Sequence, residues 1–104
     1  SNKFNDANAE ETAEIILETV LLYDSIKIQD NNLNQLAGML THITMSIPRW
    51  YAHQFILTND FENYAEKYPY QVHLIREYLK KIERIIEVSI PLEEAFAIGR
   101  YLVY

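Results

Sequence analysis

His42 and Arg49 are the residues of this chain whose types and spacing best suit a chemical role. They lie two helical turns apart in the segment 33–49, LNQLAGMLTHITMSIPR. A neutral imidazole can attack a phosphoryl group and hold it as a phosphohistidine. An arginine nearby can partly offset the added negative charge through charge-assisted hydrogen bonds. His42 is therefore a candidate phosphoryl acceptor; the alternative is an exposed histidine without a chemical role.

The segment 33–49 is predicted to be the helix that carries these two side chains. Its apolar residues recur at the three- and four-residue steps of one helix face: Leu33, Leu36, Leu40, Ile43 and Ile47. At 100° per residue they fall within an arc of about 80°, and His42 and Arg49 lie about 130° and 150° from its middle. Gly38 and Met45 complete this second line. We expect the apolar stripe to be buried and the second line to be accessible, with Pro48 ending or bending the helix before Arg49.

The rest of the chain also has helical spacing. We expect helices over residues 6–28, 61–68 and 70–88, and a fifth helix that starts at Pro91. The segment 70–88 has the clearest apolar face, formed by Val72, Ile75, Leu79, Ile82 and Ile86. Alternation of period two is missing, and two glycines and three prolines are too few for an all-β chain of short strands. The sequence predicts an all-α fold, a compact five-helix bundle.

The first predicted helix is apolar around most of its circumference. Only a narrow polar line that includes Glu11, Glu14 and Glu18 interrupts the apolar residues. Such a helix either lies at the centre of a bundle or forms half of an oligomer interface. Because this helix and the line through Met45 offer more apolar surface than one small core can hide, we expect the chain to form a homodimer.

Composition restricts the classes of function. The net charge of −6, with few and scattered basic residues, argues against direct contact with nucleic acid. No apolar run approaches the ~18 residues of a membrane span. The chain has no cysteine, and His42, His53 and His73 do not have the spacing of helical metal ligands, so we expect neither a metal nor a cofactor. We expect His73 to be solvated and His53 to be packed or hydrogen-bonded.

The domain boundaries are also read from the sequence. Ser1 and Asn2 are interpreted as an expression scar, which leaves residues 3–104 as a single domain. The chain ends at Tyr104 inside an apolar helical pattern that has no cap. We therefore expect a domain excised from a larger protein.

Five separate stretches resemble one family, the phosphotransferase system (PTS) regulation domain, or PRD. Residues 42–49, HITMSIPR, resemble the family signature His-Leu-x-x-Ala-Ile-x-Arg, and residues 59–61 resemble its Asn-Pro-Leu. Residues 68–72, YPYQV, resemble Tyr-Pro-x-x-Phe. Ile82 and Glu83, followed by IPLEE at 90–94, resemble Ile-Glu … Ile-Pro-x-Asp-Glu. Each motif alone is weak, but their order from Leu33 to Leu102 matches that of the family.

The resemblance implies a five-helix PRD module that dimerises and is phosphorylated on histidine. The phosphoryl donor would be a PTS phosphocarrier or a sugar-specific EIIB-type component. The module would control a cytoplasmic transcriptional regulator, an activator or antiterminator of sugar-utilisation genes. His42 falls on the first phosphorylatable histidine of the family, whereas the second falls on Tyr101, which cannot take a phosphoryl group in the same manner. The chain is thus similar to the C-terminal, single-histidine PRD of levanase-operon-type activators.

Two alternatives remain open at this point. One is a helical dimerisation or scaffold module in which His42 is never modified. The other is an enzyme or a metal-binding bundle, which would need a convergent polar pocket that the sequence does not indicate. Phosphate incorporation at His42 distinguishes the first alternative from a phosphorylated regulatory domain.

Overall fold

The computed structural model describes the backbone of residues 2–26 and 33–102 and the side chains from Ala9 onward. Within these ranges the chain forms five helices and no strand: α1 (Asn2–Ile26), α2 (Leu33–Tyr51), α3 (Phe61–Lys67), α4 (Pro69–Ile86) and α5 (Glu94–Gly99). The predicted all-α, five-helix fold is confirmed.

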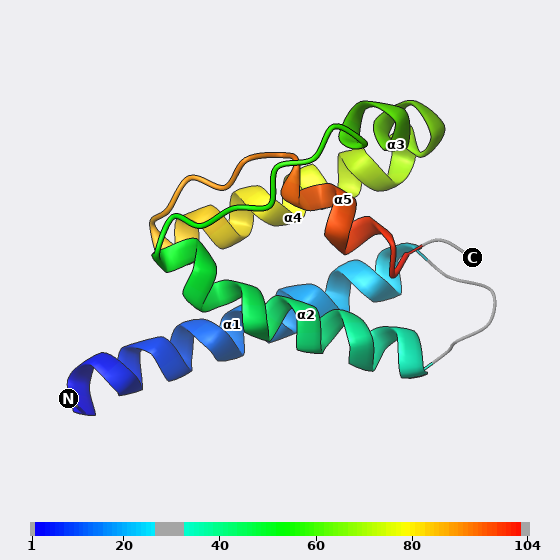
Figure 1. The fold of residues 1–104 in the computed structure, drawn as a ribbon. Helices are drawn as coiled ribbons and strands as arrows, with labels where there is room; N and C mark the ends of the chain where they lie inside the picture. Colours follow the sequence, from blue (N-terminus) through cyan, green and yellow to red (C-terminus); the bar gives the residue numbers. More distant parts are fainter. Residues whose placement is uncertain (1, 27–32, 103–104) are drawn as a thin grey trace.

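The bundle is organised around α1, which packs against both α2 and α4. The short helix α5 lies between α2 and α4 in Figure 1 and contacts both of them. The core between these four helices contains several large side chains without exposed surface, among them Ile15, Met39, Ile43, Trp50, Ile75, Ile82 and Ile98. This packing brings α5, from the C-terminal end of the chain, against the helix that carries His42.

Helix α4 follows its sequence pattern closely. All five apolar residues that were assigned to its inner face are buried, and Tyr78 joins them. Pro69 occupies the first turn, where its missing N–H costs nothing. The helix ends at Glu87, whose φ of 57° places it in the left-handed conformation of a C-terminal cap.

Helix α2 buries a different arc from the predicted one. Ile43 and Ile47 are buried, but Leu36 and Leu40 are only half-buried and Leu33 is 76% exposed. The buried residues are Met39, Ile43, Ser46, Ile47 and Trp50. Their arc is centred about 60° from the predicted one and is turned towards His42 and Arg49. The physical reason is that α2 packs against α5 as well as α1.

Pro48 does not end α2, which continues to Tyr51. Pro48 is exposed. Because proline has no N–H, one carbonyl group of the preceding turn has no backbone donor, and this group is on the solvent side of the helix. After Tyr51 the helix is terminated by His53, two residues on, whose φ is 57°. The N–H of His53 donates to the carbonyl oxygen of Trp50 (3.0 Å) and that of Gln54 to Arg49 (2.8 Å), the two hydrogen bonds of a Schellman motif.

The first and last helices also differ in part from the prediction. Helix α1 begins at Asn2 rather than at residue 6, and the last predicted residues, 27–28, lie outside the described ranges. Helix α5 begins at Glu94, because Pro91 and the two residues after it form turns in which Pro91 accepts a hydrogen bond from the N–H of Glu94 (3.1 Å).

Helix α1 has one buried and one exposed apolar face. Ile15, Leu22 and Tyr23 are buried, and Thr19 is buried between them with its hydroxyl group 2.6 Å from that of Tyr78. On the outer face four large apolar residues are exposed: Ile16, Leu17, Val20 and Leu21. The helix is therefore not enclosed at the centre of the bundle.

Candidate functional site

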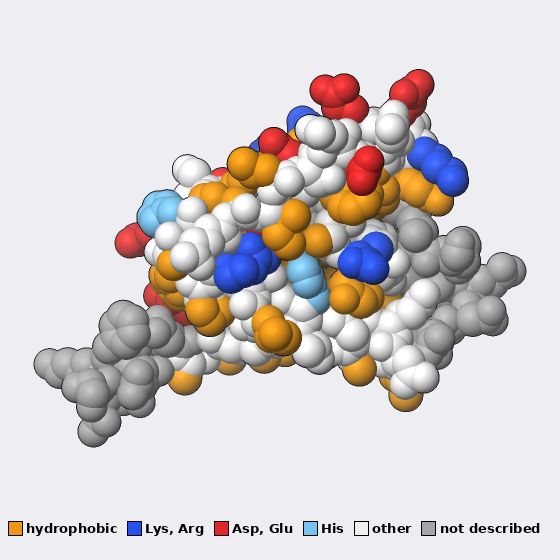
Figure 2. All heavy atoms as spheres, viewed as in Figure 1, with side chains coloured by type: hydrophobic (Ala, Val, Ile, Leu, Met, Phe, Trp, Pro, Cys, Tyr) orange, Lys and Arg blue, Asp and Glu red, His pale blue; other side chains and the backbone are white. Residues whose placement is uncertain are grey.

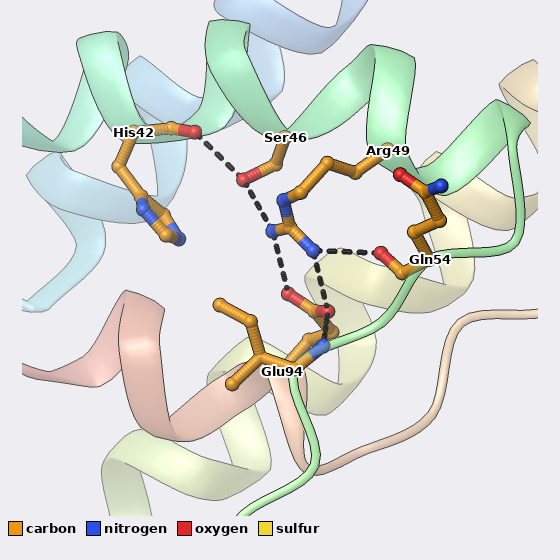
Figure 3. A network of polar contacts seen from close by, with 6 residues as sticks. His42, Ser46, Arg49, Gln54 and Glu94 are labelled. Atoms are coloured by element: carbon orange, nitrogen blue, oxygen red, sulfur yellow. Dashed lines mark hydrogen bonds and ion pairs between the residues drawn. The ribbon is translucent and has the colours of Figure 1, made fainter.

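Helix α2 places His42, Ser46 and Arg49 on one face, because they are separated by four and three residues. Ser46 links the other two. Its hydroxyl group donates to the carbonyl oxygen of His42 (2.7 Å) and accepts a hydrogen bond from Nη2 of Arg49 (3.0 Å). In Figure 3 the imidazole ring of His42 and the guanidinium group of Arg49 both extend from α2 towards α5.

Arg49 forms an ion pair with Glu94, the first residue of α5. Its Nη1 and Nη2 atoms each lie 3.3 Å from a different oxygen of the Glu94 carboxylate, so the pair is bidentate. The Glu94 side chain is fully buried, whereas that of Arg49 is 29% exposed. A buried carboxylate without a partner is strongly unfavourable, so Arg49 is what allows Glu94 to stay charged inside the bundle.

The same ion pair holds the chain that follows α2. Nη1 of Arg49 donates to the carbonyl oxygen of Gln54 (2.8 Å), and the N–H of Ile56 donates to Oε2 of Glu94 (2.7 Å). Figure 3 shows both hydrogen bonds as dashed lines that end on the ion pair. The network therefore joins α2, α5 and the connection between α2 and α3.

His42 lies at the edge of this network. Figure 2 shows that a histidine on this face of the molecule has Lys or Arg side chains on both sides. The residue is half-buried, and its Nε2 atom is buried without a hydrogen-bond partner. Burial lowers the pKa of His42 below its usual 6.5, the negative charge of Glu94 opposes this, and the positive charges of Arg49 and Arg100 add to the lowering. The ring is therefore neutral at pH 7, the protonation state that can act as a nucleophile.

The lowered pKa of His42 predicts a pH dependence of stability. Above about pH 6.5 the ring is neutral in both folded and unfolded chains. Below this pH the unfolded chain binds the proton more readily, so stability is lost as the pH falls through the folded pKa. Urea unfolding at about pH 7.5 and 5.5 should show a larger loss for the wild type than for His42→Gln. Equal losses would contradict the lowered pKa.

Tyr101 lies close to the His42 ring and to Gly38. The centroid of the Tyr101 ring is 5.8 Å from that of His42, and the two planes are tilted by 38°. A Cβ atom at Gly38 would lie 3.0 Å from Cε1 of Tyr101, so a larger residue there would press on the tyrosine ring. The glycine thus lets Tyr101 approach both α2 and His42.

A comparison with protein-family models identifies the family to which these features belong. The model described as PRD domain matches residues 14–104, which is most of the chain. The chain belongs to the PRD family. Neither the comparison with curated proteins nor that with solved structures finds a match.

PRD domains are regulatory domains of transcriptional regulators under the control of the phosphotransferase system, and they are not catalytic. The described part of this PRD domain contains no group of three or more His, Asp or Glu residues that could hold a metal ion. None of its described helices is long and apolar enough to cross a membrane.

The structure brings together four of the five site residues that the sequence singled out. Tyr101 lies beside the ring of His42 and against Gly38, and Arg49 is linked to the backbone of His42 through Ser46. Met45 is exposed and takes no part in the hydrogen-bond network. Arg49 also differs from expectation, because its guanidinium group is already paired with Glu94.

The two other histidines of the PRD domain lie apart from the network. His73 is exposed on α4, as predicted. His53 was expected to be packed or hydrogen-bonded, but it is exposed, and its ring touches only the edge of Phe55 among the described rings (6.1 Å between centroids). His53 follows the end of α2 in a left-handed backbone conformation, and histidine tolerates this conformation better than most residues.

Sequence reasoning missed Ser46, Glu94 and Arg100 as parts of the site. Ser46 carried a signal, since it lies four residues after His42 and three before Arg49. Glu94 was noted as the last residue of the motif at 90–94, without a partner. Arg100 carried no signal of its own, because its approach to His42 depends on how α5 packs.

Proposed function

We propose that this PRD domain is phosphorylated on His42 and thereby controls a cytoplasmic transcriptional regulator, an activator or antiterminator, of sugar-utilisation genes. The main supporting observation is a neutral, half-buried imidazole beside arginine side chains, at the family's acceptor position. Residues 3–104 would form the domain, excised from a larger regulator. Tyr101 in place of a second histidine supports the single-histidine type found at the C-terminus of levanase-operon-type activators.

The transfer would move a phosphoryl group from a phosphohistidine of the donor, a PTS phosphocarrier or a sugar-specific EIIB-type component. The N–P bond of the donor breaks as a ring nitrogen of His42 forms a new one, and the donor histidine keeps the electron pair. Because Nε2 is buried, reaction at this atom requires the side chain to rotate. The domain itself would bind neither nucleic acid nor membrane, metal or cofactor.

The test is phosphate incorporation from phosphorylated carrier and EIIB-type proteins, followed by mapping of the acid-labile phosphate. We expect His42→Ala to abolish labelling, whereas His53→Ala, His73→Ala and Tyr101→Phe should keep it. The three control variants change the other histidines and the tyrosine at the degenerate second site. Labelling that survives His42→Ala would contradict the proposal.

We also propose that the domain forms a homodimer through the outer face of α1. Ile16, Leu17, Val20 and Leu21 form a continuous exposed apolar stripe there, and Leu17 and Leu21 are 59% and 51% exposed. An apolar stripe of this kind is typical of a helix that packs against a second copy. The same stripe favours the second candidate function, a dimerisation or scaffold module in which His42 is not modified.

The dimer proposal predicts a change of mass in solution. Sedimentation at about 100 μM should show a dimer for the wild type and a monomer for Leu17→Glu combined with Leu21→Glu, because charges on a buried apolar interface oppose association. Leu57→Glu is the matched control, since Leu57 is a leucine that is more exposed (73%) than Leu17 and Leu21 but lies outside α1. A wild-type monomer at this concentration would contradict the proposal.

A further inference from the structure

The connection between α2 and α3 is fastened to the ion pair of Arg49 and Glu94 by two hydrogen bonds. Arg49 donates to the carbonyl oxygen of Gln54 (2.8 Å), and Glu94 accepts from the N–H of Ile56 (2.7 Å). We call this arrangement the 54–56 clamp. Each half of the ion pair thus holds one end of the same three-residue segment.

We propose that a phosphoryl group on His42 opens the 54–56 clamp by drawing Arg49 away from Glu94. The inference rests on the proposed phosphorylation of His42 and names its structural consequence. Arg49 is already tied to the backbone of His42 through Ser46, so only its side chain has to turn to reach a group on the ring. The phosphoryl group is thus the signal, and the 54–56 segment responds to it.

The phosphoryl group and the Glu94 carboxylate compete for the guanidinium group of Arg49, and this competition drives the change of partner. A phosphoryl group carries up to two negative charges and three acceptor oxygens, and arginine binds such a group in the same bidentate manner as a carboxylate. Glu94 bears one charge and is fully buried. Once Arg49 leaves, the carboxylate must take up a proton or move towards water. In either case the N–H of Ile56 loses its charged acceptor and Gln54 loses its donor.

The segment released in this way carries exposed apolar surface. Ile56 is 36% exposed, and Leu57, the residue after the segment, is 73% exposed. His53, just before the segment, has a left-handed backbone. The backbone hydrogen bonds of this turn hold its beginning, so the side-chain hydrogen bonds of the clamp are the ones that opening removes from residues 54 and 56. Opening of the clamp would therefore change the apolar surface near the phosphorylated residue, to which a partner can bind.

Arg100 is the competing cation near His42. It is exposed, and within the described residues it has no ion pair. If Arg100 took the phosphoryl group, Arg49 would stay on Glu94 and the clamp would stay closed. The experiment therefore has to distinguish between the two arginines.

The test is amide hydrogen exchange at Ile56, measured by NMR on the whole chain before and after phosphorylation with phosphoramidate. This small phosphoryl donor replaces the protein donor. We expect exchange at Ile56 to become about tenfold faster or more when His42 is phosphorylated, while exchange at Ile82 in the core of α4 stays unchanged. Unchanged exchange at Ile56 in the phosphorylated chain would overturn the inference. So would a failure of phosphoramidate to label His42 while it labels His53 and His73.

Three variants complete the test. In His42→Ala, treatment with phosphoramidate should leave exchange at Ile56 slow, and an acceleration there would overturn the inference. In Arg100→Gln the acceleration should persist. Acceleration in Arg100→Gln but not in the wild-type chain would assign the phosphoryl group to Arg100 and overturn the inference. Ser46→Ala, which keeps the ion pair and removes the link to His42, should also keep slow exchange before phosphorylation.

The outcome separates this inference from the proposed function. If carrier proteins do not label His42 but phosphoramidate labels it and accelerates exchange at Ile56, the clamp is real and the proposed donor is wrong. If carrier proteins label His42 and exchange at Ile56 does not change, the proposed function stands and the clamp mechanism is overturned.

Discussion

Arg49→Met should lower the free energy of unfolding by about 3 kcal/mol, because it leaves the fully buried carboxylate of Glu94 without its counter-charge. The variant also removes the hydrogen bonds from Arg49 to Ser46 and Gln54. Urea unfolding followed by circular dichroism measures the loss. The effect is large because one side of the pair has no access to water, unlike an ordinary surface ion pair.

A matched control and a double-mutant cycle define this prediction further. Lys81→Met breaks the partly exposed pair with Glu18 (3.4 Å) and should cost less than about 0.5 kcal/mol. Arg49→Met combined with Glu94→Gln should be more stable than the sum of the single effects by about 1.5 kcal/mol or more, because no buried charge is left unpaired. Equal losses for Arg49→Met and Lys81→Met would contradict the role of the ion pair.

Gly99→Ala should destabilise the fold by about 3 kcal/mol, because the new methyl group would overlap a buried side chain. A Cβ atom at Gly99 would lie 1.7 Å from the hydroxyl oxygen of Tyr64 and 2.2 Å from its Cζ. Tyr64 cannot move away easily, since it is buried and packs edge-on against Phe96 (5.8 Å between ring centroids). The same urea experiment measures the loss.

Two further variants test the cause of this loss. The hydroxyl group of Tyr64 is buried without a hydrogen-bond partner, and burial, together with Tyr68, raises its pKa to about 12. Tyr64→Phe alone should therefore be neutral or stabilising by up to about 1 kcal/mol. In the Gly99→Ala background it should recover part of the stability, since the nearest clashing atom is gone. Gly38→Ala, with its 3.0 Å approach to Tyr101, should cost less than Gly99→Ala. A wild-type stability for Gly99→Ala would contradict the close packing of α5.

The sequence by itself determined the helical class and most of the helix positions. Spacings of three and four residues predicted α4 and its buried face correctly, and Pro69 marked its start. These features depend on neighbours within one or two turns, which is why a single sequence reveals them. The same local reasoning identified the helix that carries His42 and placed Met45 on its exposed side.

The tertiary structure alone decided which arc of α2 is buried and what surrounds His42. The arc is turned by about 60° from the apolar stripe, because α5 covers α2 on the side of Ser46 and Arg49. Arg49 and Glu94 are 45 residues apart, and no local period relates them. Their pairing follows from the packing of α5 between α2 and α4, which also brings Tyr101 to the His42 ring. The residue types were thus readable from the sequence, whereas their partners depended on contacts between distant segments.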